Sequence, residues 1–185
     1  ETGIWRTDGL PMLYLPRHFL VNNHKAVEEA LGLEPYREIL RALALAGATA
    51  VQLDEPALLL DIAPDDRAAA EAAITALATA VPELELTLAS YFAGLDGVDA
   101  LERTVALPVA EVHLDLVRAP EQLAPALAAL APARTRLSLG VIDGRNVWAT
   151  DVDRALGQVD AAIAALGADR VTIAPSCSLL HLPFS

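Results

Sequence analysis

Two adjacent carboxylates, Asp54 and Glu55, follow an apolar run directly and precede Pro56. The run Ala48–Leu53 has the β-branched and aliphatic residues of a short buried strand, and Pro56 cannot continue a strand ladder. In an α/β barrel, sites are built at the carboxyl ends of the strands. Asp54 and Glu55 are therefore candidate catalytic residues. The alternative is that they cap the next segment by accepting backbone N–H groups.

A third candidate catalytic residue, Asp115, lies near the end of another predicted strand, Glu111–Val117. His113 lies two residues before it, so both side chains face the same side of a predicted strand. We expect a hydrogen-bonded pair between them, with a metal site as the minor alternative. Paired carboxylates with different environments can divide acid and base roles, so Glu55 with Asp115 or Asp54 is the candidate pair for a hydrolase.

The segment Gly140–Trp148 reads GVIDGRNVW and follows a further predicted strand. Its glycines permit a tight backbone. Arg145 and Asn146 offer hydrogen-bond donors, and Trp148 offers a surface for stacking. These three are candidate substrate-binding residues, and a local structural role is the alternative for Arg145.

These residues depend on a regular alternation of strand-like and helical patterns. Strands are predicted at Ala48–Leu53, Leu84–Ala89, Glu111–Val117, Arg136–Ile142 and Arg170–Ala174. Helices are predicted at Glu34–Ala46, Asp65–Ala80, Asp96–Ala106, Pro120–Leu130 and Asp151–Leu166. Alternation of this kind is typical of a parallel sheet with right-handed crossovers. Each predicted strand has one face of aliphatic side chains, which would pack against the helices. Its other face has small or polar side chains, which would point inward.

The predicted fold class is α/β, with parallel β/α repeats of a TIM-type barrel. Five or six strands in 185 residues indicate a partial barrel, because a closed one has eight strands and takes about 250 residues. An open sheet is the alternative. Residues 34–185 hold the repeats. Residues 1–33 are a poorly defined head with one candidate strand, Pro11–Leu15, between irregular stretches at Ile4–Gly9 and Arg17–Lys25.

The composition limits the partners. With 25 acidic and 13 basic residues, the net charge of -12 argues against nucleic acid and against an anionic membrane surface. The single cysteine, Cys177, excludes an internal disulfide and fits a reducing compartment, so a cytoplasmic location is expected. No uncharged apolar run approaches the roughly 18 residues of a membrane span.

Five segments occur in a specific order along residues 34–183. They are Gln52–Leu58 (QLDEPAL), Ser90–Phe92 (SYF), Leu107–Val109 with His113–Val117 (LPV and HLDLV), Gly140–Trp148, and Ser176–His181 (SCSLLH). Together they resemble cobalamin-independent methionine synthase, the 5-methyltetrahydropteroyltriglutamate–homocysteine methyltransferase family. That family has two related barrels, and the resemblance is to the second half of the N-terminal one.

The resemblance implies that the catalytic zinc lies elsewhere. The family's C-terminal barrel binds zinc through a His-x-Cys pair, a Glu and a further Cys. At the corresponding positions this chain has Leu88–Ser90, Asp115 and Cys177, so two of four ligands are missing. A catalytic zinc needs three good protein donors and an open position. We therefore expect no metal and no cofactor in this chain.

The function implied is methyl transfer from 5-methyltetrahydrofolate polyglutamate to homocysteine, which makes methionine. This segment would be the non-zinc scaffold and folate-side half, inactive by itself, and whether the chain is an enzyme stays open. Folate polyglutamate and homocysteine are the implied partners, with the remainder of the barrel or another copy. The alternatives are a non-catalytic binding or assembly module, and a stand-alone barrel enzyme that uses Glu55 and Asp115.

Overall fold

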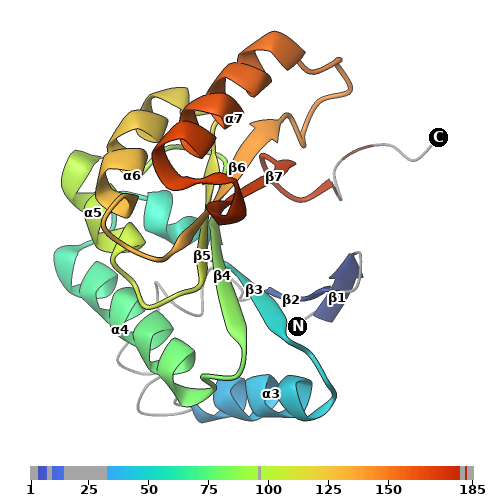
Figure 1. Cartoon of the computed structure of the whole chain (residues 1–185). Coiled ribbons are helices and arrows are strands. Elements are labelled where there is room, and N and C mark those ends of the chain that lie inside the picture. Colours follow the sequence, from blue (N-terminus) through green and yellow to red (C-terminus); the bar gives the residue numbers. More distant parts are fainter. Residues whose placement is uncertain (1–3, 8–9, 15–32, 96, 180–181, 183–185) are drawn as a thin grey trace.

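The computed structural model describes residues 4–7, 10–14, 33–95, 97–179 and 182. The predicted irregular stretch Arg17–Lys25 lies outside these residues. Within them, seven strands form one sheet in the order β1 to β7 (Figure 1). The strands are β1 (Ile4–Thr7), β2 (Leu10–Tyr14), β3 (Ala50–Asp54), β4 (Glu85–Ser90), β5 (Glu111–Asp115), β6 (Arg136–Ile142) and β7 (Val171–Pro175).

Strands β2 to β7 are parallel, and β1 pairs antiparallel with β2. The five strands predicted after residue 34 are confirmed as β3 to β7, and the candidate strand Pro11–Leu15 corresponds to β2. The irregular stretch predicted at Ile4–Gly9 is wrong for Ile4–Thr7, which forms β1. Four residues are too few for an alternating pattern to indicate a strand. Ile4–Thr7 is a strand because it pairs with β2, and that pairing is not visible in the local sequence.

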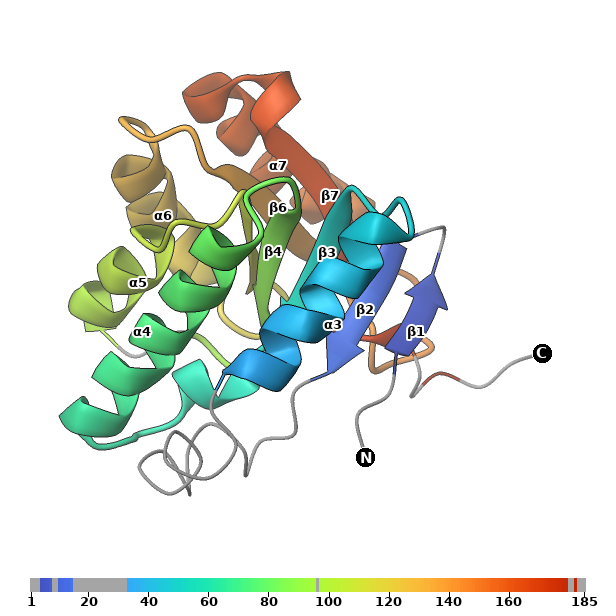
Figure 2. The ribbon, with the colours of Figure 1, turned by 90° about the horizontal axis from the view of Figure 1, so that it is seen from below.

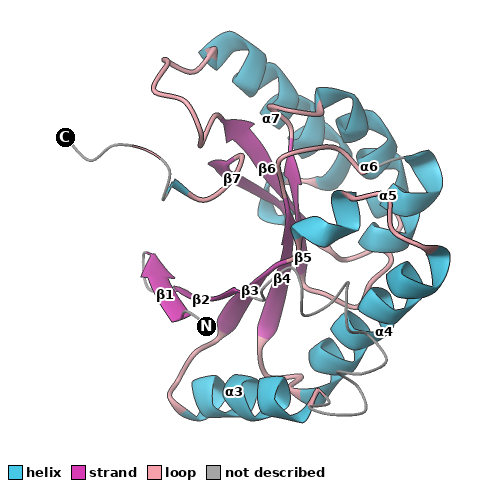
Figure 3. Cartoon of the chain, turned by 180° about the vertical axis from the view of Figure 1, so that it is seen from behind, coloured by secondary structure: helices cyan, strands magenta, loops and turns pink. Residues whose placement is uncertain are grey.

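Within the described residues, five α-helices cover the convex face of the curved sheet (Figures 2 and 3). They are α3 (Glu34–Leu45), α4 (Pro64–Ala80), α5 (Gly97–Val105), α6 (Leu123–Leu130) and α7 (Val152–Leu166). Short 3-10 helices occur at Pro56–Leu59, Pro120–Gln122 and Ala168–Arg170. Helices on one side of a curved parallel sheet form part of a TIM-type barrel, as predicted. None of the described helices is long and apolar enough to cross a membrane.

The core lies between the sheet and the helices. Alternate strand residues such as Leu53, Leu88, Leu114 and Leu137 are almost completely buried there. Their neighbours along each strand point to the concave face, because side chains alternate across a sheet. The concave face is therefore the polar one, as the sequence predicts.

Candidate functional site

A pocket of about 300 Å3, lined by both polar and apolar side chains, lies on the concave face of the sheet. Its lining comes from every strand between β3 and β7 and from the segment after β7. The polar lining residues are Gln52, Thr87, Tyr91, Glu111, His113, Ser138, Thr172, Cys177 and Ser178. Of the inward polar side chains predicted from strand alternation, those of Gln52, Thr87, His113, Ser138 and Thr172 meet in this hollow, whereas Asp54 and Asp115 do not line it.

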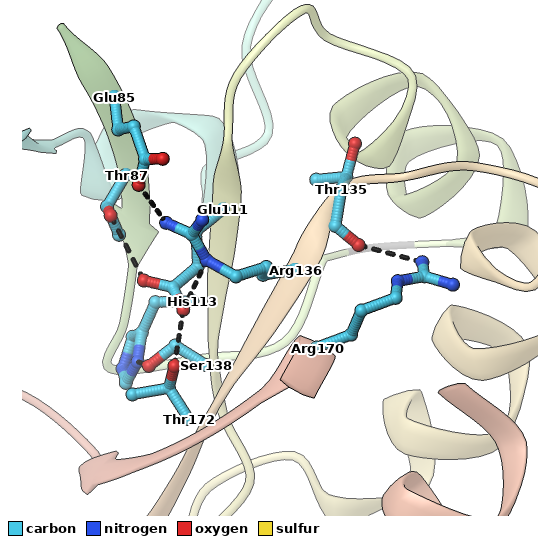
Figure 4. A network of polar contacts seen from close by, with 9 residues as sticks. All are labelled: Glu85, Thr87, Glu111, His113, Thr135, Arg136, Ser138, Arg170 and Thr172. Carbon is cyan, nitrogen blue, oxygen red and sulfur yellow. Dashed lines mark hydrogen bonds and ion pairs between the residues drawn. The ribbon is translucent and has the colours of Figure 1, made fainter. Parts of the chain in front are cut away.

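Glu111 organises the amino-terminal part of this face and was not predicted (Figure 4). Its Oε2 accepts a hydrogen bond from Thr87 Oγ1 at 3.0 Å, and its Oε1 accepts one from Thr172 Oγ1 at 2.6 Å. Arg136 Nε lies 3.8 Å from Glu111 Oε1, and the Arg136 guanidinium also binds Glu85 at 2.6 Å, which lowers the pKa of Glu85. The carboxylate thereby links β4, β5 and β7. The sequence contained a signal, because Glu111 shares its strand face with His113 and Asp115.

His113 is buried in the next layer of the pocket. Its Nε2 lies 3.4 Å from the Ser176 carbonyl oxygen, which can only accept, so Nε2 carries the hydrogen and Nδ1 accepts from Ser138 Oγ at 2.9 Å. Burial lowers the pKa of His113, which keeps the ring neutral at neutral pH. The predicted His113–Asp115 pair is wrong, since the structure gives each side chain different partners.

Asp115 binds backbone amides at the carboxyl end of β5. Its Oδ1 accepts hydrogen bonds from Val117 N at 3.1 Å and Arg118 N at 2.9 Å, and its Oδ2 accepts one from Phe92 N at 3.0 Å. The residue is 1% exposed. Both carboxylate oxygens are thus used to fix the segments that follow β4 and β5. This geometry fits a positioning role better than acid–base chemistry.

Asp54 is likewise buried at the end of β3. Its Oδ1 accepts a hydrogen bond from Gln52 Nε2 at 2.6 Å, and its Oδ2 accepts one from the Tyr91 hydroxyl at 3.1 Å. Burial raises the pKa of Asp54, and these two hydrogen bonds oppose the shift. The Glu55 backbone N–H bonds to the carbonyl of Ala89 at 2.8 Å. Asp54 and Asp115 therefore approach the same segment, Ser90–Phe92, from β3 and β5.

The carboxyl ends of β3–β7, with the segments that follow them, form what we call the rim. At the rim, the rings of Tyr91 and Phe92 meet edge to face with centroids 4.6 Å apart. The guanidinium carbon of Arg145 lies 4.8 Å from the centroid of the Phe92 ring. The structure thus joins Arg145, after β6, to the segment after β4.

The three candidate substrate-binding residues have different surroundings. Arg145 stacks on Phe92, whereas the Asn146 side chain donates a hydrogen bond to Asp143 Oδ2 at 2.6 Å. This bond, with one from Arg145 N to Asp143 Oδ1, lowers the pKa of Asp143. Trp148 is 78% exposed and borders a separate hollow of about 180 Å3 beside α7. Only Arg145 is brought to the tyrosine–phenylalanine pair.

Cys177 lies in the pocket and is buried. Burial raises the pKa of its thiol, which disfavours the thiolate needed by a nucleophile or a metal ligand. Asp115, at the other zinc-related position, already binds backbone amides. Within the described ranges, no three His, Cys, Asp or Glu side chains are grouped so as to hold a metal.

Comparison with known proteins identifies similar sequences. The family described as "Cobalamin-independent synthase, N-terminal domain" matches residues 14–166. Proteins named 5-methyltetrahydropteroyltriglutamate–homocysteine methyltransferase are 54% identical in Salinibacter ruber and 50% identical in Mesorhizobium japonicum, each over 151 residues. Each alignment covers 82% of this chain and 19% of the relative. The chain therefore spans about a fifth of the length of these relatives.

Solved structures show the same architecture at low sequence identity. A B12-independent methionine synthase from Shewanella has a TM-score of 0.65 at 16% identity, over 96% of this chain and 57% of that one. A dihydropteroate synthase from Xanthomonas albilineans has a TM-score of 0.57 at 15% identity, over 89% and 59%. At such identities the likeness concerns the fold alone.

Proposed function

This chain belongs to the cobalamin-independent methionine synthase family, in its N-terminal domain, and from that membership we propose that it is part of a methyltransferase. The proposed reaction moves a methyl group from 5-methyltetrahydrofolate polyglutamate to homocysteine. The match over residues 14–166 carries the proposal. This segment is the scaffold and folate-side half, works in the cytoplasm, and does not catalyse the reaction alone.

The chemistry supports that division of roles. A thiol with a pKa near 8.5 is mostly protonated at neutral pH, so homocysteine needs a group that holds it as a thiolate. The family resemblance implies that a zinc ion supplies this in the other barrel. Here Asp115 is engaged by backbone amides, and Cys177 is buried with a raised pKa. Neither residue is arranged to bind the metal or activate the thiol, and we place zinc outside this segment.

Of the alternatives, an assembly role has a supporting observation. Leu156 and Ile163 of α7 and Ile173 of the edge strand β7 are large apolar side chains exposed to solvent. Leu156 and Ile163 have helical spacing with the buried Val159 and Leu166 of α7, and exposed large apolar side chains on a helix and an edge strand favour a partner. We propose the remainder of the barrel as that partner. A stand-alone enzyme that uses Glu55 and Asp115 fits less well, because the Asp115 carboxylate is occupied.

The test of the proposed division is turnover. The purified chain, mixed with 5-methyltetrahydropteroyltriglutamate, homocysteine and zinc, is expected to form no methionine. The complete Salinibacter ruber relative provides the positive control under the same conditions. Methionine formation by the isolated chain would contradict the scaffold role.

A further inference from the structure

Phe92 adopts a backbone conformation that a bulky side chain rarely takes. Its φ is 85°, in the left-handed region, where β-carbon crowding disfavours residues other than glycine. Two buried carboxylates maintain this conformation. Asp115 Oδ2 accepts the Phe92 N–H, and Asp54 Oδ2 accepts the hydroxyl of Tyr91, whose ring packs against Phe92. Strain fixed by its surroundings in this way is typical of functional segments.

The strained conformation presents the Phe92 ring to Arg145. Phe92 is 39% exposed, and the Arg145 guanidinium carbon lies 4.8 Å from the centroid of its ring. Stacking on an aromatic ring uses the face of the guanidinium and leaves the N–H donors in its plane available. The contact therefore orients the Arg145 guanidinium at the rim and leaves its N–H groups available to donate hydrogen bonds.

The nearby acid on the same loop does not use these donors. Asp143 Oδ1 accepts from the Arg145 backbone N–H at 2.9 Å, and its Oδ2 accepts from Asn146 at 2.6 Å. Within the part of the chain that the structure describes, no carboxylate forms an ion pair with the Arg145 guanidinium. In a chain with a net charge of -12, Arg145 is therefore a cationic group at the rim that has no acidic partner among the described residues.

We propose that the Arg145 guanidinium, oriented by Phe92, binds a carboxylate group of the substrate. A planar guanidinium matches a carboxylate through two parallel hydrogen bonds. Barrel enzymes bind substrates at this end of their strands. The inference rests on the proposed function, whose substrates offer two sources of a carboxylate, the glutamyl tail of the folate and the α-carboxylate of homocysteine.

Calorimetric titration of the full chain distinguishes these sources. The probes are 5-methyltetrahydropteroyltriglutamate, free triglutamate and homocysteine. We expect R145Q to weaken binding of the relevant carboxylate probe about 10-fold, as loss of one charge-assisted pair predicts. R145K keeps the charge but not the planar guanidinium, and we expect it to lose most of the affinity that Arg145 contributes in the wild type. R134Q is the matched control, because Arg134 is also exposed but lies before β6, at the opposite end of that strand from Arg145.

Each outcome decides the inference. A 10-fold loss in R145Q for triglutamate and for the folate, with R134Q unchanged, supports the site and assigns it to the glutamyl tail. The same loss for homocysteine alone supports the site and assigns it to the amino acid. If the folate, free triglutamate and homocysteine all bind R145Q as tightly as the wild type, the carboxylate site is wrong and the proposed function stands. If the wild type binds none of the probes, the carboxylate site and the folate-side role both fail.

Discussion

Asp115 Oδ2 lies 3.0 Å from the backbone nitrogen of Phe92 and accepts its hydrogen bond. The bond connects the end of β5 to the segment after β4. Asp115 Oδ1 meanwhile accepts from Val117 N and Arg118 N. One buried carboxylate therefore fixes two rim segments. Arg145 is connected to these segments because its guanidinium stacks on the Phe92 ring.

The first prediction concerns this carboxylate. D115N places an amide in a site that receives three N–H groups, so we expect the free energy of unfolding to fall by about 2 to 3 kcal/mol. D143N is the control, because Asp143 is only partly buried, and should cost about 0.5 kcal/mol or less. Urea denaturation of both variants measures the difference. Equal stability of D115N and the wild type would rule out the positioning role of Asp115.

The second prediction isolates the backbone strain at Phe92. F92G and F92A both remove the ring, but only glycine adopts a φ of 85° without a penalty. We expect F92G to be more stable than F92A by about 1 kcal/mol, the reverse of the usual order. Thermal unfolding compares the two directly. An F92A variant as stable as F92G would show that the left-handed conformation is not retained.

The third prediction concerns the close approach at Gly140. A β-carbon there would lie 2.7 Å from the Leu114 carbonyl oxygen and 2.9 Å from His113 Cε1. G140A should therefore destabilise the chain by about 1 to 3 kcal/mol through overpacking. G157A is the matched control, since no atom lies within 4 Å of its β-carbon position in α7, and should stabilise by about 0.5 to 1 kcal/mol. Similar effects of the two changes would contradict the packing described.

The fourth prediction follows from the lowered pKa of His113. Burial disfavours the imidazolium, while attraction from Asp115 and Glu111 opposes the shift. Below the unfolded pKa of about 6.5, the unfolded state therefore binds more protons than the folded state. The contribution of His113 to the free energy of unfolding is therefore fully present above the unfolded pKa and is lost as the pH falls below it. The free energy of unfolding should decline less between pH 7.5 and 5.5 in H113N than in the wild type, and parallel profiles would refute the assignment.

The strands could be predicted because their signal is local. Val112 and Leu114 alternate with polar residues, and this pattern alone indicates a strand with two different faces. The side-chain partners could not be predicted. His113 and Asp115 are two residues apart, which is about 6.6 Å along a strand. His113 instead pairs with Ser138, directly opposite on β6, and that register is not visible in the sequence.

The same limit applies to the rim. Arg145 and Phe92 follow β6 and β4, which are separated by β5, so their contact depends on loop conformations rather than on strand order. Glu111 could have been found, because it shares the parity of His113 and Asp115. Its hydroxyl partners, Thr87 and Thr172, depend on register again.

The most direct test of the central claim is a transplant into a complete enzyme. The segment of the Salinibacter ruber methyltransferase that aligns with this chain over 151 residues is replaced by the corresponding residues of this chain. Methionine formation from homocysteine and 5-methyltetrahydropteroyltriglutamate is then measured. We predict that the chimera retains turnover within about 10-fold of its parent, a difference of about 1.4 kcal/mol. A chimera that unfolds at the parent's temperature, binds zinc and yet forms no methionine would contradict the account.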